Sequence, residues 1–372
     1  MTQPGNVVEL LQHLVRIPSV NPDGDPGTEH TGEQAIAEYV CHFLKDIGAV
    51  AAVEPVLPGR PNVTGHFPAL AGKPVVLLAP HLDTVSVVGM SIPPFDGGLR
   101  DGRVYGRGAS DTKGSMAAML WALREIAANP ELCRYDVRFA AVMGEEAGHE
   151  GAHLLAKTLK ADFAIVGEPT DLRMVHRHKG ARWMRLVTGG LAGHGSNPRP
   201  HENAILRMAT ILPEMRAAAD AWAADADPVL GATTLNVGVI RGGSKVNIVP
   251  DRCEAALDMR IISESPRWMG DLEDIVARHA AYTTLETTGS SPLLDTALDS
   301  PLAKALIAHG AAPDVAPWFC DAAIFAKAGV PSVALGPGKI AQAHTADEWI
   351  AVDDLLRGAE FFRSFLLDVR AV

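Results

Sequence analysis

The stretch LLAPHLDTVSV, residues 77–87, joins an apolar run to a pair of chemically active side chains. The run begins at Val75 and is short and apolar throughout, as is typical of a strand covered on both faces of a sheet. It ends at Pro80, and His81 and Asp83 follow directly. Because ligands bind beyond the carboxyl ends of the strands in open parallel sheets, the stretch predicts a buried strand that leads into a functional site.

Similar apolar runs recur along the chain, and they occupy residues 74–79, 137–143, 163–166 and 332–335. Between them lie segments in which apolar residues recur at helical spacing, such as 116–128 and 152–159. Strands that alternate with helices indicate an α/β domain with a mainly parallel sheet.

The middle of the chain has a different pattern. Its expected elements run in the order strand, helix, strand, strand, helix, strand, at residues 182–188, 203–223, 233–240, 254–262, 267–280 and 283–288. This split-βαβ, ferredoxin-like order makes a complete small α+β domain. We therefore expect a domain at 181–288 that is inserted between two parts of one catalytic domain, 1–180 and 289–372.

Length and composition limit the classes of protein. The chain has 372 residues, which favours two domains, and a formal net charge of −11, which argues against nucleic acid or an anionic membrane as a partner. The amino-terminal sequence has no signal-peptide pattern, and no apolar run approaches the ~20 residues of a membrane-spanning helix. The four cysteines lack CxxC spacing, which is typical of reduced thiols. We expect a cytoplasmic protein.

Side chains that can bind metal follow each predicted strand. They are His81 and Asp83 after the first, Glu145 and Glu146 after the second, Glu168 after the third and His344 after the fourth, with Asp111 at the start of a helix. Each alone has an ordinary interpretation, such as a helix cap or a solvated helix start. Together they bring two imidazoles and several carboxylates to one edge of one sheet. Clustered carboxylates repel one another unless cations neutralise them, so the pattern favours a metal site.

Two histidines with three carboxylates suit two zinc-like ions, ~3.5–4 Å apart and bridged by one carboxylate. A ligating histidine usually donates its second N–H to a carboxylate, which fixes its tautomer. We therefore interpret His81 as a ligand and Asp83 as the carboxylate that orients it. Cobalt or manganese would fit the same donors, because availability often decides which metal is bound.

The motifs of the chain, in their combination and order, resemble a known family. They are PHLDT (80–84), DGRVYGRGASDTKGSMAAM (101–119), GEEAGHEGA (144–152), VGEPT (166–170), GHGSNPRPHENAI (193–205), KVNIVPD (245–251), DMRI (258–261) and LGPGKIAQAHTADEWI (335–350). They resemble the di-zinc metallopeptidases and deacylases, a family that contains acetylornithine deacetylase, succinyl-diaminopimelate desuccinylase and carboxypeptidase G. The resemblance implies a phosphorylase/hydrolase-like α/β catalytic domain with an inserted lid and dimerisation domain.

The resemblance also implies roles for individual residues. His81 and Glu168 would bind one zinc ion, Glu146 and His344 the other, and Asp111 would bridge the two. Glu145 would be the general base and acid, His194 would polarise the scissile carbonyl, and Asn247 and Arg260 would hold the substrate carboxylate. The family further implies a cis peptide bond after Asp111 and a homodimer in which His194 acts in the opposite subunit. Three other histidines, His149, His153 and His201, have no role in this site, and we expect them at the surface.

The motifs predict hydrolysis of the amide bond of an N-acyl-L-amino acid, and the ending LGPGKIAQAHTADEW is most similar to acetylornithine deacetylase. A metallo-carboxypeptidase, a dipeptidase acting on short peptides or a desuccinylase stays an alternative, because the same centre serves all of them. Phe319–Cys320 stands where acetylornithine deacetylases usually have Gly-Thr, and His201 where relatives often have Gly, so the acyl group and the side chain stay undecided. A non-catalytic ligand-binding homologue is a remote alternative, against which the complete set of site residues argues.

Overall fold

The computed structural model describes residues 3–23 and 30–367, and the chain forms two compact units. The first unit comprises Met1–His176, Asp295–Asp314 and Cys320–Val372, and the second comprises Arg177–Leu294 and Val315–Phe319. The second unit is wider at both ends than the predicted 181–288. Its last strand runs on to Ser291 through a polar Thr-Gly-Ser-Ser segment, in which apolar periodicity gives no signal.

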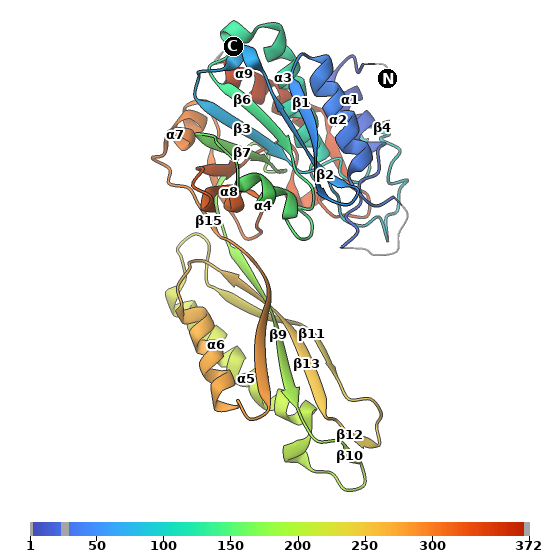
Figure 1. Cartoon of the computed structure of the whole chain (residues 1–372), viewed down its shortest axis with the longest axis vertical. Coiled ribbons are helices and arrows are strands. Elements are labelled where there is room, and N and C mark those ends of the chain that lie inside the picture. The colour runs from blue at the N-terminus through green and yellow to red at the C-terminus, as the bar shows by residue number, and fades with distance from the viewer. Residues whose placement is uncertain (1–2, 24–29, 368–372) are drawn as a thin grey trace. The chain divides into compact units, whose positions relative to one another are not determined.

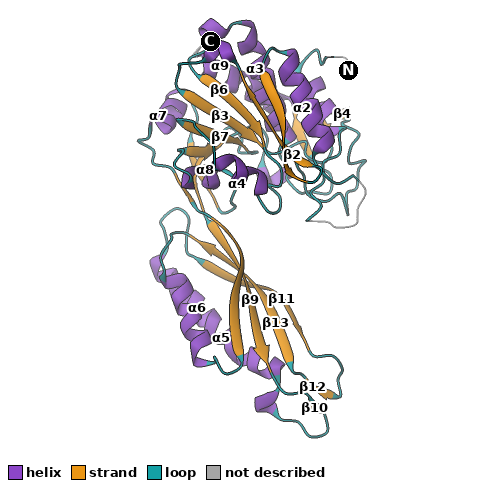
Figure 2. Ribbon diagram, viewed as in Figure 1, coloured by secondary structure: helices purple, strands orange, loops and turns teal. Residues whose placement is uncertain are grey.

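One mixed β-sheet with helices on both faces forms the first unit (Figures 1 and 2). Among the described residues its strands lie in the order β1-β2-β6-β3-β7-β17-β8-β15, and β16 pairs with β8. The bounds are β1 (Val50–Leu57), β2 (Arg60–His66), β3 (Val75–Pro80), β6 (Asp136–Ala141), β7 (Phe163–Gly167), β8 (Met174–His178), β15 (Leu294–Asp295), β16 (Pro313–Ala316) and β17 (Ser332–Ala334).

This sheet is parallel only at its centre. The neighbours β6, β3, β7 and β17 are parallel, whereas β1 with β2, β2 with β6, and β17 with β8 are antiparallel. The prediction of a mainly parallel sheet is therefore confirmed for the central strands and wrong at the edges. Strand β1 reads VAAVEPVL, so Glu54 and Pro55 interrupt its apolar run, and most of its residues are exposed.

Helices explain why the central strands are apolar on both faces. They are α1 (Val7–Val15), α2 (Gln34–Asp46), α3 (Lys113–Ala128), α4 (Glu150–Ala156), α7 (Pro301–Ala308), α8 (Ala322–Lys327) and α9 (Val352–Leu367). Val76 and Leu78 of β3 belong to the core shared with α1, α3 and α9. Leu77 and Ala79 are also buried and point to the opposite face, where α4 and α8 lie side by side (Figure 1).

Short elements complete the chain. A three-stranded sheet joins β18 (Trp349–Ala351), β5 (Arg103–Tyr105) and β4 (Leu99–Arg100), and the 3₁₀ turns are η1 (Pro68–Leu70), η2 (Pro130–Leu132), η3 (Pro200–Glu202), η4 (Trp222–Asp225) and η5 (Ile340–Gln342). Within residues 3–23 and 30–367, every helix is too short or too polar to cross a membrane.

A four-stranded antiparallel sheet in the order β11-β13-β9-β14 forms the second unit, with α5 and α6 along one face (Figure 1). The bounds are β9 (Gly180–Gly189), α5 (Ala204–Ala221), β11 (Thr234–Gly242), β13 (Arg252–Ile261), α6 (Arg267–Arg278) and β14 (Thr283–Ser291), and a small ribbon joins β10 (Gly193–His194) to β12 (Ile248–Val249). The elements follow one another in the predicted ferredoxin-like order. Each of the two helices packs an apolar stripe into the core of this unit, and it was this helical spacing of apolar residues that allowed the prediction.

Candidate metal centre

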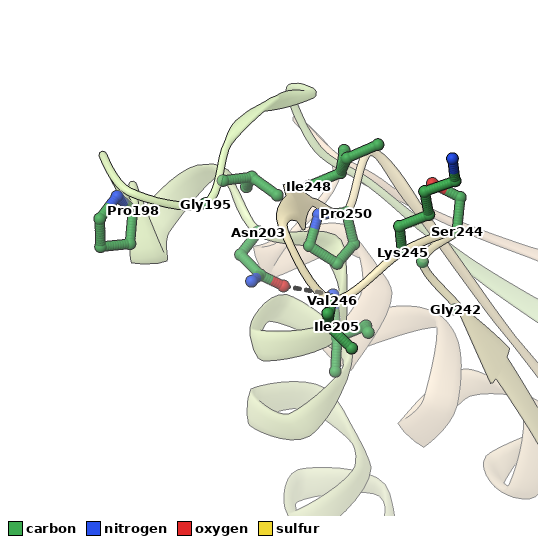
Figure 3. A pocket seen from close by; sticks show the side chains of 12 residues that line it. Gly195, Pro198, Asn203, Ile205, Gly242, Ser244, Lys245, Val246, Ile248 and Pro250 are labelled. Carbon is green, nitrogen blue, oxygen red and sulfur yellow. Dashed lines mark hydrogen bonds between the residues drawn. The ribbon is translucent and has the colours of Figure 1, made fainter.

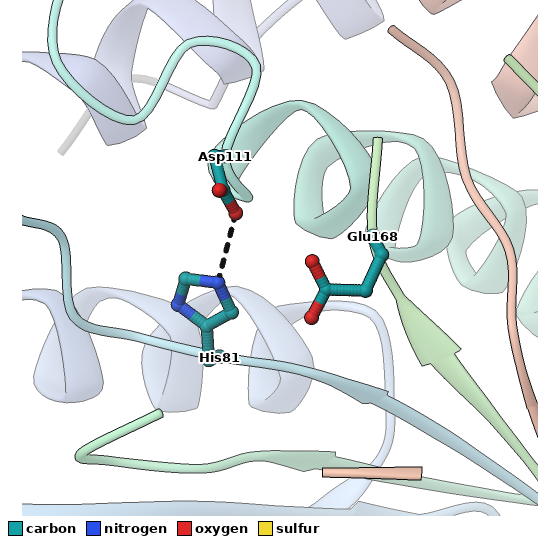
Figure 4. Close-up of side chains that lie close together, drawn as sticks. All are labelled: His81, Asp111 and Glu168. Carbon is teal, nitrogen blue, oxygen red and sulfur yellow. Dashed lines mark hydrogen bonds and ion pairs between the residues drawn. The ribbon is translucent and has the colours of Figure 1, made fainter. Parts of the chain in front are cut away.

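The carboxyl ends of the central strands carry the first group of candidate ligands. His81 follows β3, Glu168 follows β7, and Asp111 lies just before α3. One donor atom from each of these residues lies within 4.8 Å of the others, and Figure 4 shows the side chains directed toward a common space. All three residues are buried. The convergence expected at the edge of the sheet is thus present in the structure.

A second group shares Asp111 with the first and adds Glu146 and His344. Asp111 Oδ1 lies 3.1 Å from His81 Nε2, and Asp111 Oδ2 lies 3.4 Å from His344 Nε2. Glu146 Oε2 lies 3.1 Å from the same nitrogen of His344. A carboxylate that turns one oxygen toward each histidine has the arrangement expected of a bridging ligand between two metal ions.

The unpartnered atoms of this cluster fit a pair of divalent cations. In the described part of the chain, Glu146 Oε1 and Glu168 Oε1 are buried without a hydrogen-bond partner. Buried carboxylate oxygens without partners are costly, and bound cations would satisfy them. Imidazole nitrogen and carboxylate oxygen suit zinc, cobalt and manganese, so the donor set fits the predicted metals.

Protons and cations compete for this cluster. Burial is the largest cause that raises the pKa of Glu168 and of Glu146. Hydrogen bonds to Asp111 and Glu146 raise the pKa of His344 to about 10. Burial would also raise the pKa of Asp111, but the hydrogen bonds from His344 and His81 hold it below its usual value. Without a cation the cluster therefore retains protons, which metal binding would displace.

Asp83 is fully buried and supports two motifs at once. Its carboxylate accepts hydrogen bonds from the main-chain N–H groups of Glu145 and Glu146, each at 3.0 Å, and from the Asn21 amide at 2.8 Å. His81 Nδ1 lies 2.9 Å from the main-chain carbonyl of Asp83 and 3.5 Å from its carboxylate. The hydrogen bond of His81 is thus to the main chain of Asp83, with the carboxylate that we predicted as its partner slightly farther away, and that carboxylate fixes the turn that carries Glu145 and Glu146, which the sequence pattern did not indicate.

Glu348 is a buried site residue that the sequence pattern missed. It accepts hydrogen bonds from the main-chain N–H groups of Gly108, Ser110 and Asp111 at 2.9–3.1 Å, and it pairs with Arg107 at 2.6 Å. It directly precedes β18, whose pairing with β5 brings it to this loop. Because Glu348 lies 237 positions away from the loop that it holds, local sequence gives no signal of this contact.

The peptide bond after Asp111 is cis, as predicted.

Glu145 lies beside the ligand groups and forms a separate cluster with His149 and Asp321. Burial is the largest cause that raises the pKa of Glu145 well above its usual value, and the nearby His81 and His149 act in the opposite direction. A carboxyl group with a raised pKa suits proton transfer near neutral pH. The prediction that His149 lies at the surface is wrong, whereas His153 and His201 are exposed as expected.

His194, the third candidate catalytic residue, and the candidate substrate-binding residues Asn247 and Arg260 lie in the second unit, at two ends of its sheet. His194 is exposed in β10, with Nδ1 2.7 Å from Ser196 Oγ, and the carbonyl of Asn247 accepts a hydrogen bond from the loop that follows β10. Arg260 is at the far end of β13, paired with Asp258 at 3.0 Å and lying over the Phe319 ring. Because a strand rises ~3.3 Å per residue, the two ends are ~25 Å apart.

A pocket of about 560 Å³ lies beside the β10–β12 ribbon (Figure 3). It is bounded by the loop after β10, by the first turn of α5 and by residues 242–250. Asn203 caps that helix by accepting hydrogen bonds from the N–H groups of Ile205 and Leu206. The pocket therefore lies at the end of the sheet that carries His194 and Asn247.

Known proteins resemble the chain over nearly its whole length. The chain matches Peptidase family M20/M25/M40 over residues 77–368. It is 30% identical to an acetylornithine deacetylase of Photorhabdus laumondii subsp. laumondii, over 92% of each chain, and 28% identical to one of Proteus mirabilis, over 92% of this chain and 91% of that one. An M20 family metallo-carboxypeptidase, Sso-CP2 from Sulfolobus solfataricus, has the same fold, with a TM-score of 0.79 and 21% identity over 98% of this chain and 99% of that chain.

Proposed function

The chain belongs to peptidase family M20/M25/M40, whose members include metal-dependent hydrolases of amide bonds, and we propose that it hydrolyses N-acyl-L-amino acids. One observation carries this proposal: the two oxygens of Asp111 face two different histidines, His81 and His344, and Glu145 lies next to this cluster. The names of the relatives, two acetylornithine deacetylases, support a deacylase.

In this proposal, two groups of side chains would each hold one metal ion. His81, Asp111 and Glu168 would hold one ion, and Asp111, Glu146 and His344 would hold the second. Two zinc ions fit these donors, and cobalt or manganese fit them as well. When bound, such ions act as Lewis acids on a carbonyl and lower the pKa of a water molecule toward ~7.

The side chains of the protein supply the proton transfers and the contacts to substrate. Glu145 accepts a proton from the attacking water and returns it to the leaving amine. Its main chain is fixed by Asp83, which keeps the carboxylate beside the cluster. His194 donates a hydrogen bond to the carbonyl oxygen as negative charge develops there. Arg260 and Asn247 hold the free carboxylate, for which a guanidinium is well suited.

The separation of these residues supports a homodimer. A small substrate cannot span the ~25 Å between Arg260 and the end of the sheet that carries His194 and Asn247, so one substrate would take these contacts from two subunits. The edge strand β11 also exposes Val237, Val239 and Ile240 by 41%, 46% and 53%. An apolar edge of this kind favours pairing with a second copy.

The buried free cysteines Cys41, Cys133, Cys253 and Cys320 support a reducing compartment, and we place the enzyme in the cytoplasm.

A dipeptidase or carboxypeptidase is the second candidate, and Phe319 favours it. This ring packs edge-to-face against Trp183 with centroids 5.6 Å apart, and the Arg260 guanidinium lies 5.3 Å from its centroid. An aromatic wall next to the proposed carboxylate-binding arginine would suit a substrate with a large apolar residue at its carboxyl end.

A substrate panel tests the proposal. The enzyme, supplied with zinc, is given N-acetyl amino acids, N-succinyl amino acids and dipeptides, each as the free acid and as the methyl ester. We expect N-acetyl amino acids to have the highest kcat/KM and their esters to be poor substrates. Faster hydrolysis of dipeptides would favour the second candidate, and no hydrolysis of any free acid would refute both.

A further inference from the structure

The loop that carries Glu145 and Glu146 runs from β6 to α4 and is closed by His149. The main-chain N–H of His149 donates a hydrogen bond to the carbonyl of Gly144 at 2.7 Å. This bond joins the two ends of the segment 144–149. The position of the Glu145 side chain therefore depends on what holds His149.

The side chain of His149 is held by an acidic residue from a distant part of the chain. His149 Nδ1 lies 2.9 Å from Asp321 Oδ1, and the two side chains are only 7% and 1% exposed. Asp321 directly precedes α8, which lies next to α4 (Figure 1). Loss of one partner from a buried ion pair leaves the other charge uncompensated, so the contact ties the loop firmly to α8.

The same pair lies against Glu145. One nitrogen of His149 and one oxygen each of Glu145 and Asp321 lie within 4.8 Å of one another. The turn is also held by the Asp83 carboxylate, which accepts hydrogen bonds from the main-chain N–H groups of Glu145 and Glu146. The turn is therefore fixed through its main chain by Asp83 and from the side by His149.

We propose that His149 and Asp321 are positioning residues that hold the 144–149 loop and thereby place the Glu145 carboxylate for proton transfer. The effect on catalysis rests on the proposed function, whereas the holding of the loop does not. The competing interpretation is a third cation bound by Glu145, His149 and Asp321, because Asp321 Oδ2 is buried and has no hydrogen-bond partner in the described part of the chain. The ion pair favours positioning, since it already engages Nδ1 of the imidazole.

The first test is a double-mutant cycle in the full-length, metal-loaded enzyme. His149→Gln and Asp321→Asn are each made in the wild-type and in a Glu145→Gln background, and His153→Gln, at an exposed position in the helix α4 that follows His149, is the control. In the wild-type background we expect kcat to fall ~10–100-fold with KM little changed and metal content intact. In the Glu145→Gln background, measured in single turnovers, the same changes should have no further effect. Equal losses in both backgrounds would show a general structural role and overturn the proposal.

The second test is independent of activity. Amide hydrogen exchange in the segment 144–149 should be faster in His149→Gln and in Asp321→Asn than in the wild type, while exchange in α3 stays unchanged and His153→Gln behaves as wild type. Unchanged exchange in 144–149 would overturn the proposal. So would three bound metal ions per chain in the wild type and two in His149→Gln. If the wild type hydrolyses no substrate of the panel, the proposed function fails, and the exchange result still decides whether the pair holds the loop.

Discussion

Asp111 is the residue on which the two candidate metal positions meet. Its carboxylate faces a buried histidine on one side and a half-exposed one on the other, since His344 has 52% of its side chain exposed. The position beside His81 is therefore the more enclosed of the two. We infer that an ion beside His344 exchanges with solvent more readily than an ion beside His81.

Glu145→Ala should bind metal normally and lose turnover. The side chain lies outside both ligand groups, and its removal eliminates a proton-transfer step worth ~10²–10⁴-fold in rate. Metal content and kcat are measured on the same preparation. A variant that has lost its metal, or one that retains a near-normal rate, would contradict the assignment of Glu145 as the general base.

Metal should stabilise the protein more at high pH than at low pH. In the metal-free cluster the pKa of His344 is raised from 6.5 to about 10, and the pKa values of Glu146 and Glu168 are raised above 4.5. The folded state then holds protons that the unfolded chain has released, so the stability from the two glutamates begins to be lost as pH rises above 4.5, and the stability from His344 is lost as pH rises from 6.5 toward 10.

The pKa of Lys113, lowered to about 7 mainly by burial, acts in the opposite sense between pH 7 and 10.5, so the metal-loaded and metal-free proteins must be compared at each pH. The difference in Tm between the two forms, followed by calorimetry, should grow from pH 6 to pH 9. A difference that shrinks over this range would show that the cluster does not exchange protons for metal.

At the scale of elements, buried carboxylates far away in sequence fix the loops that follow the strands. Glu348 holds the loop before α3 through three main-chain N–H groups, and Asp83 holds the loop after β6 through two. Such hydrogen bonds to a carboxylate are charge-assisted and rigid. The candidate ligands are therefore positioned by loops that have little regular structure but have fixed main chains.

Asp83→Asn should weaken metal binding at both positions. An asparagine side chain has only one oxygen, so it cannot accept all three hydrogen bonds that Glu145, Glu146 and Asn21 donate to Asp83. The substitution also removes the negative charge next to His81. Loss of such a supporting group typically costs ~10–100-fold in affinity. Competitive metal titration against a chelating dye measures both sites, and weakening of one site alone would show that Asp83 supports only that ligand.

Glu348→Gln should lower metal affinity and Tm although it leaves the side chain of every candidate ligand unchanged. The amide replaces one acceptor oxygen with a donor, and it leaves Arg107 without a negatively charged partner. Asp347→Asn, at the exposed neighbouring position, is the control and should behave as wild type. If both variants bind metal as tightly as wild type, the loop before α3 keeps its shape without Glu348.

The sequence was sufficient for the parts of the structure that local patterns determine. The central strands follow from short apolar runs, and the residues that come together around Asp111 lie in the segments that follow these runs, His344 after a longer loop than the others. Edge strand β1 was missed because Glu54 and Pro55 interrupt its apolar run. Glu348 and the pair of His149 with Asp321 were missed because their partners lie 172 or more positions away, and only the folded chain brings them together.

For the molecule as a whole, the candidate catalytic groups are divided between two compact units. Glu145 and the candidate ligands belong to the first, and His194, Asn247 and Arg260 belong to the second. An arrangement in which each subunit lends His194 to its partner would make the dimer part of the mechanism. The exposed apolar residues of β11 are the surface that we expect to be covered in that dimer.

Mixing two inactive variants should restore activity. His194→Ala and Glu145→Ala are each expected to be nearly inactive, but a heterodimer contains one site with both residues intact, supplied by different chains. The variants are dissociated, mixed and allowed to reassociate, and the rate is compared with that of each variant treated alone. If activity stays absent although sedimentation shows that heterodimers have formed, His194 acts within its own chain.

The pairing of metal ions across Asp111 is best examined by titrating the metal-free enzyme with zinc. Bound zinc per chain and the rate of N-acetyl amino acid hydrolysis are followed together in the wild type and in Asp111→Asn. Two ions per chain should bind to the wild type, with full activity only after the second, and Asp111→Asn should weaken both ions and lose activity. A single ion at full activity, or an Asp111→Asn enzyme that still binds two ions and turns over, would contradict a centre built on one shared carboxylate.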